Sequence, residues 1–294
     1  MSTPHAALHA SFARAAETLW PVLDELVPGV SIEVVAQTDS TNSQLLQRAR
    51  SGDASPTVMV ALEQTAGRGR QGRRWHAAPG DSLTFSLALP WASPLGAGAD
   101  AGPALSGLSL AVGVALAEVL DPAVRLKWPN DLWLQGRKLG GILIEITPAG
   151  ATAQRVVVVG VGLNIAASLS VAEALTSPVT GPAPVAVSAL QEVDPLATAA
   201  RVFERVVPAL LRAWKLFSIS GWSAFAPRFA QRDALLGEPV QLWQGADVVG
   251  EGRAQGVDSL GRLLVHTAHG LQAWSSGEVS ARPGLRSASP PSSA

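Results

Sequence analysis

The segment richest in groups that could do chemistry is residues 67–75, GRGRQGRRW, which carries four arginines within seven residues. Like charges packed this closely disfavour a folded loop unless an anion completes it, and the interspersed glycines would let the backbone approach that anion. Arginine offers planar, permanently charged donors that suit a carboxylate or a phosphate. The spacing therefore predicts an anion-binding loop, and the alternative is a solvated basic loop or one that touches nucleic acid.

The glycines of this loop also satisfy two phosphate-binding patterns, and neither fits. The glycines at 67, 69 and 72 give GxGxxG, but a dinucleotide loop opens a helix, and here a Pro-Gly pair and a strand-like run follow. A P-loop continues with Lys and then Ser or Thr, whereas this chain has arginines at 73 and 74. Neither a Rossmann fold nor a P-loop ATPase is indicated.

Lysine is rare, and its placement is therefore informative. Only three of the 22 basic residues are lysines, and two of them, Lys127 and Lys138, lie in the segment KWPNDLWLQGRKLGGILIE. Pro-Asn-Asp is typical of a turn, and residues 132–134 and 139–146 predict a hairpin with its turn at 135–137. That hairpin would bring the two lysines towards neighbouring strand ends as compact point charges. An ordinary hairpin with surface lysines is the alternative.

Two further polar segments accompany these. GVGLN at 160–164 follows a Val-rich run, where glycines either let a ligand approach closely or form a plain tight turn. DSTN at 39–42 supplies N-cap chemistry for a helix over residues 43–50.

The elements that must position these groups follow two different patterns along the chain. Hydrophobic periodicity predicts helices over residues 7–27, 105–120 and 196–217, and strands over 32–35, 57–62, 83–89, 125–127, 132–134, 139–146 and 155–161. From about residue 235, short strands alternate with Gly-bearing turns, which is typical of a small β-barrel. Residues 167–195, rich in Ala, Pro and Ser, predict an irregular excursion.

Composition limits the classes of protein that remain. A length of 294 residues with 47% apolar and 15% charged residues excludes a disordered chain and allows one large domain and one small one. The formal net charge of −1 gives no bulk attraction for nucleic acid or membrane. The absence of cysteine excludes disulfides, thiolate nucleophiles and Cys-based zinc sites. No targeting or membrane-spanning run is evident, so a cytoplasmic location is expected.

Five segments together resemble the biotin–protein ligases in order and spacing: DSTN, GRGRQGRRW, KWPND (127–131), KLGGILIE (138–145) and GVGLN. Residues 256–257 and WSSGE at 274–278 are similar to that family's C-terminal domain. The resemblance implies an α+β fold, a mixed sheet with helices like that of class II tRNA synthetases, plus an SH3-like C-terminal β-barrel. The implied domains are a short N-terminal helix (1–30), a catalytic domain (31–232), the C-terminal domain (233–283) and a disordered tail (284–294).

The resemblance also implies an activity and a site. Biotin would be activated by ATP as biotinyl-5′-adenylate and transferred to a lysine of the biotin carboxyl-carrier protein. The implied catalytic cations are Arg68, Arg70, Lys127 and Lys138. The implied biotin site comprises Ser40, Thr41, Asn42, Gln64, Arg68, Gly69, Arg70 and Lys138, and the implied nucleotide site comprises Arg73, Trp75, Asn130, Asp131, Gly162 and Asn164. Mg²⁺ would accompany the nucleotide, and its protein ligands are not predicted.

The expected partner is the carrier protein of acetyl-CoA carboxylase or a related carboxylase, without DNA or membrane, and the expected state is a monomer or weak homodimer. Family members that repress transcription carry an N-terminal winged helix-turn-helix. Only about 30 residues precede the first predicted core strand, so the purely catalytic type is expected. Lipoate–protein ligases share the fold and the adenylate chemistry and are one alternative. A nucleic-acid-binding module that uses the Gly/Arg loop is another, from a different class.

Overall fold

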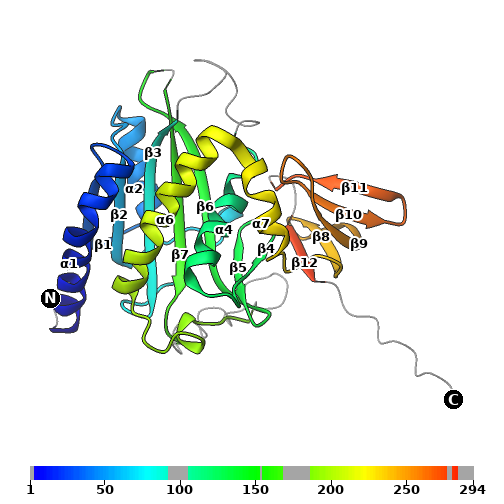
Figure 1. Ribbon diagram of the computed structural model, residues 1–294, viewed down its shortest axis with the longest axis horizontal. Helices are drawn as coiled ribbons and strands as arrows, with labels where there is room; N and C mark the ends of the chain where they lie inside the picture. The colour runs from blue at the N-terminus through cyan, green and yellow to red at the C-terminus, as the bar shows by residue number, and fades with distance from the viewer. Residues whose placement is uncertain (1–2, 92–104, 153, 168–185, 277–279, 284–294) are drawn as a thin grey trace.

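The chain folds around a mixed seven-stranded sheet (Figure 1), seen in a computed structural model that describes residues 3–91, 105–152, 154–167, 186–276 and 280–283. The strand order is β1-β2-β3-β7-β6-β5-β4; β1 and β2 pair in parallel, and the remaining pairs are antiparallel. The strands are β1 (Ser31–Thr38), β2 (Thr57–Gln64), β3 (Ser82–Trp91), β4 (Arg125–Lys127), β5 (Asp131–Leu134), β6 (Arg137–Pro148) and β7 (Arg155–Asn164). This is the mixed sheet that the sequence predicts.

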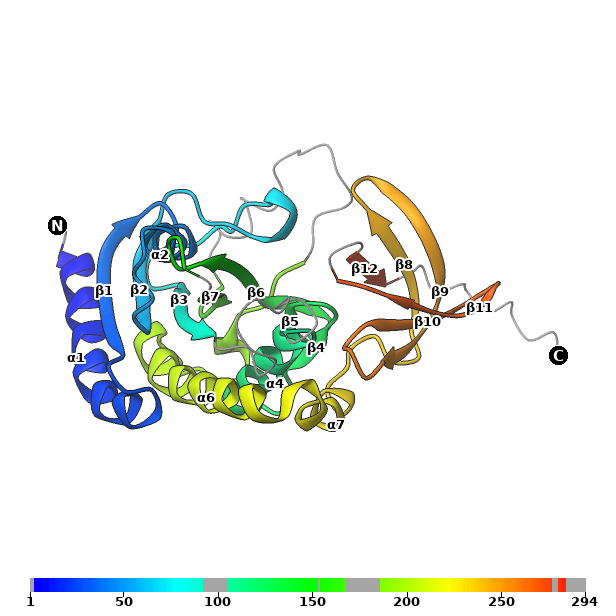
Figure 2. The same cartoon turned by 90° about the horizontal axis from the view of Figure 1, so that it is seen from above.

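Helices cover the two faces of the sheet unequally (Figure 2). Three of them lie on one side: α1 (Thr3–Leu26), α4 (Leu108–Leu120) and α6 (Ala199–Ser220). On the other side α2 (Thr41–Arg50) packs against β2, β3, β6 and β7, and the chain between β2 and β3 continues across that face. The face that carries α2 is therefore the one left accessible to a ligand.

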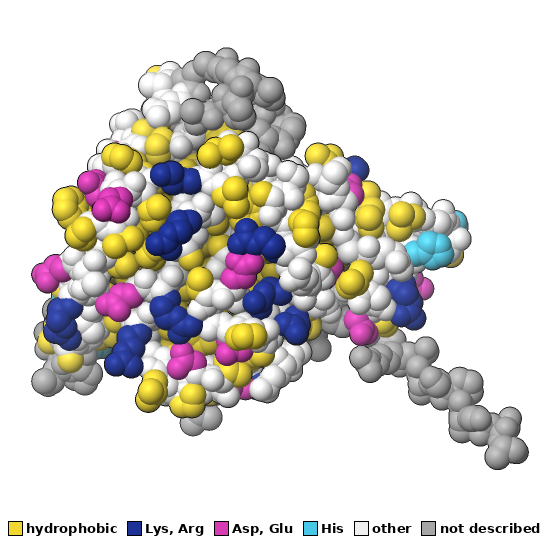
Figure 3. Space-filling model, in the orientation of Figure 1, with side chains coloured by type: hydrophobic (Ala, Val, Ile, Leu, Met, Phe, Trp, Pro, Cys, Tyr) yellow, Lys and Arg dark blue, Asp and Glu magenta, His cyan; other side chains and the backbone are white. Residues whose placement is uncertain are grey.

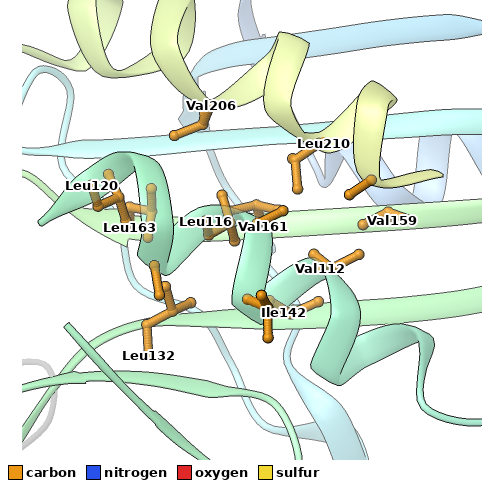
Figure 4. Close-up of a cluster of buried hydrophobic side chains, with 14 of the residues drawn as sticks. Val112, Leu116, Leu120, Leu132, Ile142, Val159, Val161, Leu163, Val206 and Leu210 are labelled. Carbon is orange, nitrogen blue, oxygen red and sulfur yellow. The ribbon is translucent and has the colours of Figure 1, made fainter. Parts of the chain in front are cut away.

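The residues of β7 show why the two faces differ. Val159, Val161 and Leu163 point towards α4 and α6 (Figure 4), and with Val157 they belong to the main hydrophobic core. The alternate positions include Gly160, Gly162 and Asn164, which lie on the α2 side because side chains alternate along a strand. On β6, Gly141 pairs with Gly162 and Leu143 with Gly160, so the same side of both strands is glycine-rich.

The remaining elements form a small C-terminal sheet and its connection. After α6 come the turn η3 (Gly221–Ala224) and α7 (Ala226–Ala230); the turns η1 (Arg70–Gly72) and η2 (Leu190–Glu192) occur earlier in the chain. The second sheet is antiparallel, in the order β11-β10-β9-β8-β12. Its strands are β8 (Pro239–Gln244), β9 (Asp247–Val257), β10 (Leu263–Thr267), β11 (Gly270–Trp274) and β12 (Ser280–Pro283).

The elements agree with those predicted, with differences at their ends. The third predicted helix begins at Leu108 rather than at 105, and the last predicted helix covers Ala199–Ser220 rather than 196–217. Most of the predicted excursion and the whole predicted tail lie outside the described residues. Among the helices in the described ranges, none combines the length and apolar character needed to cross a lipid bilayer.

The surface of the helical side carries no continuous basic stripe. Figure 3 shows Lys and Arg side chains interspersed with Asp and Glu and with apolar groups on that face. Basic side chains there include Arg228, which pairs with Glu118, and Arg205, which pairs with Asp194. This face therefore offers no clustered positive charge of the kind that tracks a nucleic-acid backbone.

Candidate active site

The first part of the candidate site lies at the N-terminus of α2. Ser40 is the N-cap, and its hydroxyl accepts a hydrogen bond from the backbone N–H of Ser43. The Thr41 backbone N–H donates to Gln64 Oε1 at 2.8 Å, which ties the helix to the end of β2. Ser40, Thr41 and Asn42 are all buried. The structure thus brings together four of the residues that the resemblance assigns to biotin: Ser40, Thr41, Asn42 and Gln64.

The second part is a half-buried carboxylate shared by two lysines. Lys127 ends β4 and lies directly opposite Asp131 at the start of β5, while Lys138 lies near the start of β6. The Nζ atom of Lys138 lies 2.7 Å from Asp131 Oδ1, and that of Lys127 lies 3.5 Å from Asp131 Oδ2. The predicted hairpin is present, with its turn at Gln135 and Gly136, both at positive φ. It brings the two lysines onto one carboxylate.

Burial and charge act against each other at this carboxylate. Burial lowers the pKa of Lys127, and although Asp131 opposes the shift, the neighbouring Lys138 adds to it. Burial also acts to raise the pKa of Asp131, but the ammonium groups of Lys138 and Lys127 outweigh it and hold that pKa below the usual range. Two cations share one anion here, so an incoming carboxylate or phosphate would meet net positive charge.

The third part is the arginine loop, residues 67–75, which closes on itself as a small hairpin. The Gly69 N–H donates to the Arg73 carbonyl at 2.7 Å, and the Trp75 N–H donates to the Gly67 carbonyl at 2.9 Å. Gln71 at φ 55° and Gly72 at φ 71° make the reversal. The strand β3 follows the loop without an intervening α-helix, whereas a dinucleotide-binding loop would open a helix.

The four arginines of this loop do not converge on one point. Arg68 pairs with Glu145, with Nη2 3.0 Å from Oε1, and Arg74 donates to the Thr65 carbonyl. Arg70 reaches the lysine pair, donating to Asn130 Oδ1 at 3.2 Å and to the Ser276 carbonyl.

Arg70 and Arg73 carry the loop's charge towards the lysine pair. Burial is the main cause that lowers the pKa of Arg70; the Asp131 carboxylate opposes the shift, and the charge of Arg73 adds to it. Among the described residues Arg70 forms no ion pair within 4 Å, and the anion that acts on it is the Asp131 carboxylate, which the two lysines already share. Arg73 itself donates to Gln71. The arginines thus have separate partners here, and the anion-binding role of the loop stays a prediction.

The fourth part is an aromatic ring laid on a glycine of β7. A Cβ atom placed on Gly162 would lie 2.4 Å from the Trp75 indole, so only glycine lets the ring approach. Next along β7, Asn164 donates to the carbonyls of Lys138 and Ser188 at 3.3 and 3.1 Å. Among the residues that the structure describes, the Trp75 Nε1 and Asn164 Oδ1 atoms are buried without a hydrogen-bond partner, so their hydrogen-bonding capacity is unused.

Three residues of this region were not predicted from the sequence. Glu145 pairs with Arg68 and accepts from Asn42 Nδ2 at 3.0 Å. Ser86 of β3 donates to Asn42 Oδ1 at 2.6 Å, and Gly160 leaves room for that amide. A signal existed for two of them: Ser86 interrupts the apolar strand LTFSLAL, and Glu145 lies two and four residues beyond Leu143 and Gly141 on the same side of β6.

A magnesium ion would have few protein ligands here. Within the described residues no group of three His, Cys, Asp or Glu side chains is placed to hold a metal. Both oxygens of Asp131 face ammonium groups, and Arg70 already donates to Asn130 Oδ1. These contacts fit an ion that arrives with a nucleotide and is held chiefly by its phosphates, as Mg²⁺ commonly is.

Comparison with known proteins shows which class of protein the chain resembles. Residues 34–164 match the Biotin/lipoate A/B protein ligase family, and residues 235–282 match the Biotin protein ligase C terminal domain. The chain is 36% identical over 265 residues to the bifunctional ligase/repressor BirA of Escherichia coli, a match covering 86% of this chain and 75% of that protein.

Two further matches cover their counterparts almost completely. The biotin–[acetyl-CoA-carboxylase] ligase of Paracoccus denitrificans is 35% identical over 249 residues, which is 84% of this chain and 98% of that protein. The structure of the biotin protein ligase of Aquifex aeolicus in complex with biotin and ATP aligns with a TM-score of 0.66 at 26% identity, covering 86% of this chain and 99% of that one. The chain belongs to the biotin–protein ligase family.

Proposed function

We propose that this chain is the ligase that attaches biotin to a carboxyl-carrier protein. The biotin carboxylate attacks the α-phosphate of ATP, which expels pyrophosphate and leaves biotinyl-5′-adenylate, a mixed anhydride. A lysine amine of the carrier then attacks the anhydride carbonyl and releases AMP. ATP and biotin are both substrates, and Mg²⁺ supplies charge neutralisation on the phosphates when it is bound.

The observation that carries the proposal is the half-buried carboxylate of Asp131 with a lysine on each oxygen, 2.7 and 3.5 Å away. A carboxylate that approaches a triphosphate meets strong repulsion, and fixed cations in a water-poor site lower it most effectively. We assign Lys138, Lys127 and Arg70 to this work. Arg68, which pairs with Glu145, is the fourth cation.

The remaining roles follow from where each group lies. Ser40, Thr41 and Gln64, which are tied together at the N-terminus of α2, are assigned to biotin with Gly69 of the loop. Trp75, Gly162 and Asn164 are assigned to the nucleotide, because the indole packs on the glycine and Trp75 Nε1 and Asn164 Oδ1 have unused hydrogen-bonding capacity. Arg73, Asn130 and Asp131 are assigned to the phosphates, because the charge of Arg73 acts on Lys127 and Asn130 binds Arg70.

The carrier of acetyl-CoA carboxylase or a related carboxylase is the proposed protein substrate. We place the reaction in the cytoplasm, where ATP and such carriers meet, and we expect a monomer or weak homodimer that binds no DNA. The near-zero net charge of −1 supports the last expectation. The proposed domain division is an N-terminal helix (1–30), the catalytic domain (31–232), the C-terminal domain (233–283) and a tail (284–294).

The test is transfer of labelled biotin to a recombinant carrier domain in the presence of ATP and Mg²⁺, with labelled lipoate as the competing substrate. Labelling of the carrier with biotin and not with lipoate is the expected result. Preferential transfer of lipoate would instead identify the chain as a lipoate ligase. A gel shift with DNA that persists in excess biotin and ATP would favour a nucleic-acid-binding role for the Gly/Arg loop.

A further inference from the structure

A chain of polar side chains runs beneath the candidate site and connects its two ends. The Thr41 and Ser86 hydroxyl oxygens lie 2.6 Å apart, and Ser86 Oγ lies 2.6 Å from Asn42 Oδ1. Asn42 Nδ2 lies 3.0 Å from Glu145 Oε2, and the other oxygen of Glu145 lies 3.0 Å from Arg68 Nη2. One relay thus links the α2 end of the site to the arginine loop.

Hydrogen-bond chemistry fixes the direction of each bond. A carboxylate only accepts, so the amide NH₂ of Asn42 must face Glu145 and its oxygen must face Ser86. Ser86 therefore donates to Asn42, and because its single proton is engaged there, it accepts from Thr41. The proton of Thr41 has two protein acceptors, Ser86 Oγ at 2.6 Å and Gln64 Oε1 at 3.2 Å, and the relay requires the bond to Ser86. Because a protein group holds that proton in either case, the Thr41 hydroxyl can only accept from a ligand, which fits a ureido N–H and not a carbonyl.

Protein groups use most of the hydrogen-bonding capacity of Asn42. The residue is only 3% exposed; its Nδ2 atom faces Glu145 and the Leu143 carbonyl, the latter at 3.4 Å, and its Oδ1 atom accepts from Ser86 with one of its two lone pairs. A Cβ atom at Gly160 would lie 2.2 Å from Asn42 Oδ1, so the amide rests directly on the backbone of β7. The Asn42 amide is therefore surrounded by protein groups at each of these contacts.

We infer that Asn42 and Glu145 are positioning residues: together they hold the Arg68 guanidinium at one end of the site and the Thr41 hydroxyl at the other. This inference rests on the proposed biotin ligase function and assigns Asn42 an indirect role in place of contact with biotin. Glu145 is the anchor of the relay, because its charge determines the orientation of the Asn42 amide and pairs with Arg68.

The test exchanges the two groups. Asn42→Asp sets a carboxylate against Glu145, and Glu145→Gln sets two amides together, so each single variant mispairs the relay. The double variant Asn42→Asp/Glu145→Gln restores one amide and one carboxylate with the original total charge. Each single variant is expected to raise the KM for biotin by about tenfold, the size of a lost hydrogen bond to a charged group, with the KM for ATP unchanged. The double variant is expected to recover at least about fivefold of that loss.

The outcomes separate three roles for Asn42. If it contacted biotin directly, the double variant would keep the full loss of the Asn42→Asp variant, and the inference would be wrong. If it only supported the fold, the thermal midpoint would fall and the KM values for biotin and ATP would rise together, which would also overturn the inference. Ser86→Ala breaks the relay without changing charge and is expected to raise the biotin KM alone; an unchanged KM would contradict the relay.

The matched control is Glu33→Gln, which breaks a half-buried ion pair between β1 and Arg48 of the same helix, α2, and should leave both KM values unchanged because the pair lies outside the relay. A wild-type chain that forms no biotinyl-adenylate would reject the proposed function and the relay with it. An active wild-type chain with an unrescued double variant would reject the relay alone.

Discussion

At the scale of single residues, the site is defined by an excess of fixed positive charge around one carboxylate. Asp131 pairs with Lys127 and Lys138, and Arg70 donates a hydrogen bond to the preceding residue, Asn130. Lysine serves here as a compact point charge, in a chain whose basic residues are otherwise arginines apart from Lys215. The pair is oriented before any substrate arrives, which is what makes fixed charges effective in catalysis.

Lys138→Ala should reduce biotin-dependent exchange of pyrophosphate into ATP by about 10²–10³-fold, the usual cost of losing one electrostatic contact to a reacting group. The fold should survive, because Lys127 remains to pair with Asp131. Lys215→Ala is the matched control: Lys215 is the third lysine of the chain and lies exposed on α6. Equal rates in the two variants would remove Lys138 from the reaction.

Asp131→Asn should destabilise the protein by about 1–3 kcal/mol near neutral pH, since it leaves two half-buried ammonium groups without their anion. The folded-state pKa of Asp131 is lowered, so its contribution to stability is present above the unfolded value and is lost as pH falls through the folded value. In urea unfolding, the difference between wild type and variant should therefore shrink below about pH 4.

Glu118→Gln is the control for this pH series, because it breaks the exposed pair with Arg228 and should cost no more than about 1 kcal/mol at any pH. A gap between wild type and Asp131→Asn that stays constant as the carboxylate is protonated would contradict the pairing.

At the scale of elements, the sequence predicted the features that depend only on neighbouring residues. The N-cap at Ser40 and the turn at Gln135 and Gly136 depend on a few neighbouring residues, and both are present. The partner of each arginine depends instead on how the strands pair: Glu145 comes within reach of Arg68 through the pairing of β6 with β7. The ion pair between Arg68 and Glu145 joins residues 77 positions apart in the sequence, so no local sequence pattern predicts it.

The arginine loop should gain protection from hydrogen exchange when a non-hydrolysable adenylate analogue binds. Only a few backbone bonds close the loop, most of its side chains are exposed, and its arginines repel one another. A bound phosphate would relieve that repulsion and offset the ordering cost of about 1–2 kcal/mol per residue. Amides of β3, in the sheet core, serve as the internal reference. Equal protection of residues 67–75 with and without the analogue would show that the loop is preformed.

At the scale of the whole molecule, the turn at residues 258–261 joins the C-terminal sheet to the larger one. The buried indole of Trp128 donates to the Gly261 carbonyl at 3.1 Å, and that of Trp222 donates to the Asp258 carbonyl at 3.2 Å. Ser106 donates to the Leu260 carbonyl of the same turn. Because Arg70 also reaches Ser276, the C-terminal sheet helps to place a cation of the site.

We therefore expect the two sheets to unfold in a single calorimetric transition. Trp128→Phe should lower its midpoint by several degrees, since a buried carbonyl loses its donor at a cost of about 1–3 kcal/mol. Trp20→Phe is the control, because Trp20 lies 51% exposed on α1. Two resolved transitions in the wild-type protein would show that the sheets are energetically independent.

The most direct measurement of the central claim is the compound that the protein makes in the absence of any carrier. The purified chain is incubated with biotin, ATP and Mg²⁺, and the bound product is released and identified by mass spectrometry, with pyrophosphate measured in parallel. Biotinyl-5′-adenylate, formed with biotin and not with lipoate and accompanied by pyrophosphate, is the predicted result. Cleavage of ATP without an adenylate, or no product at all, would contradict the assignment of this site to biotin activation.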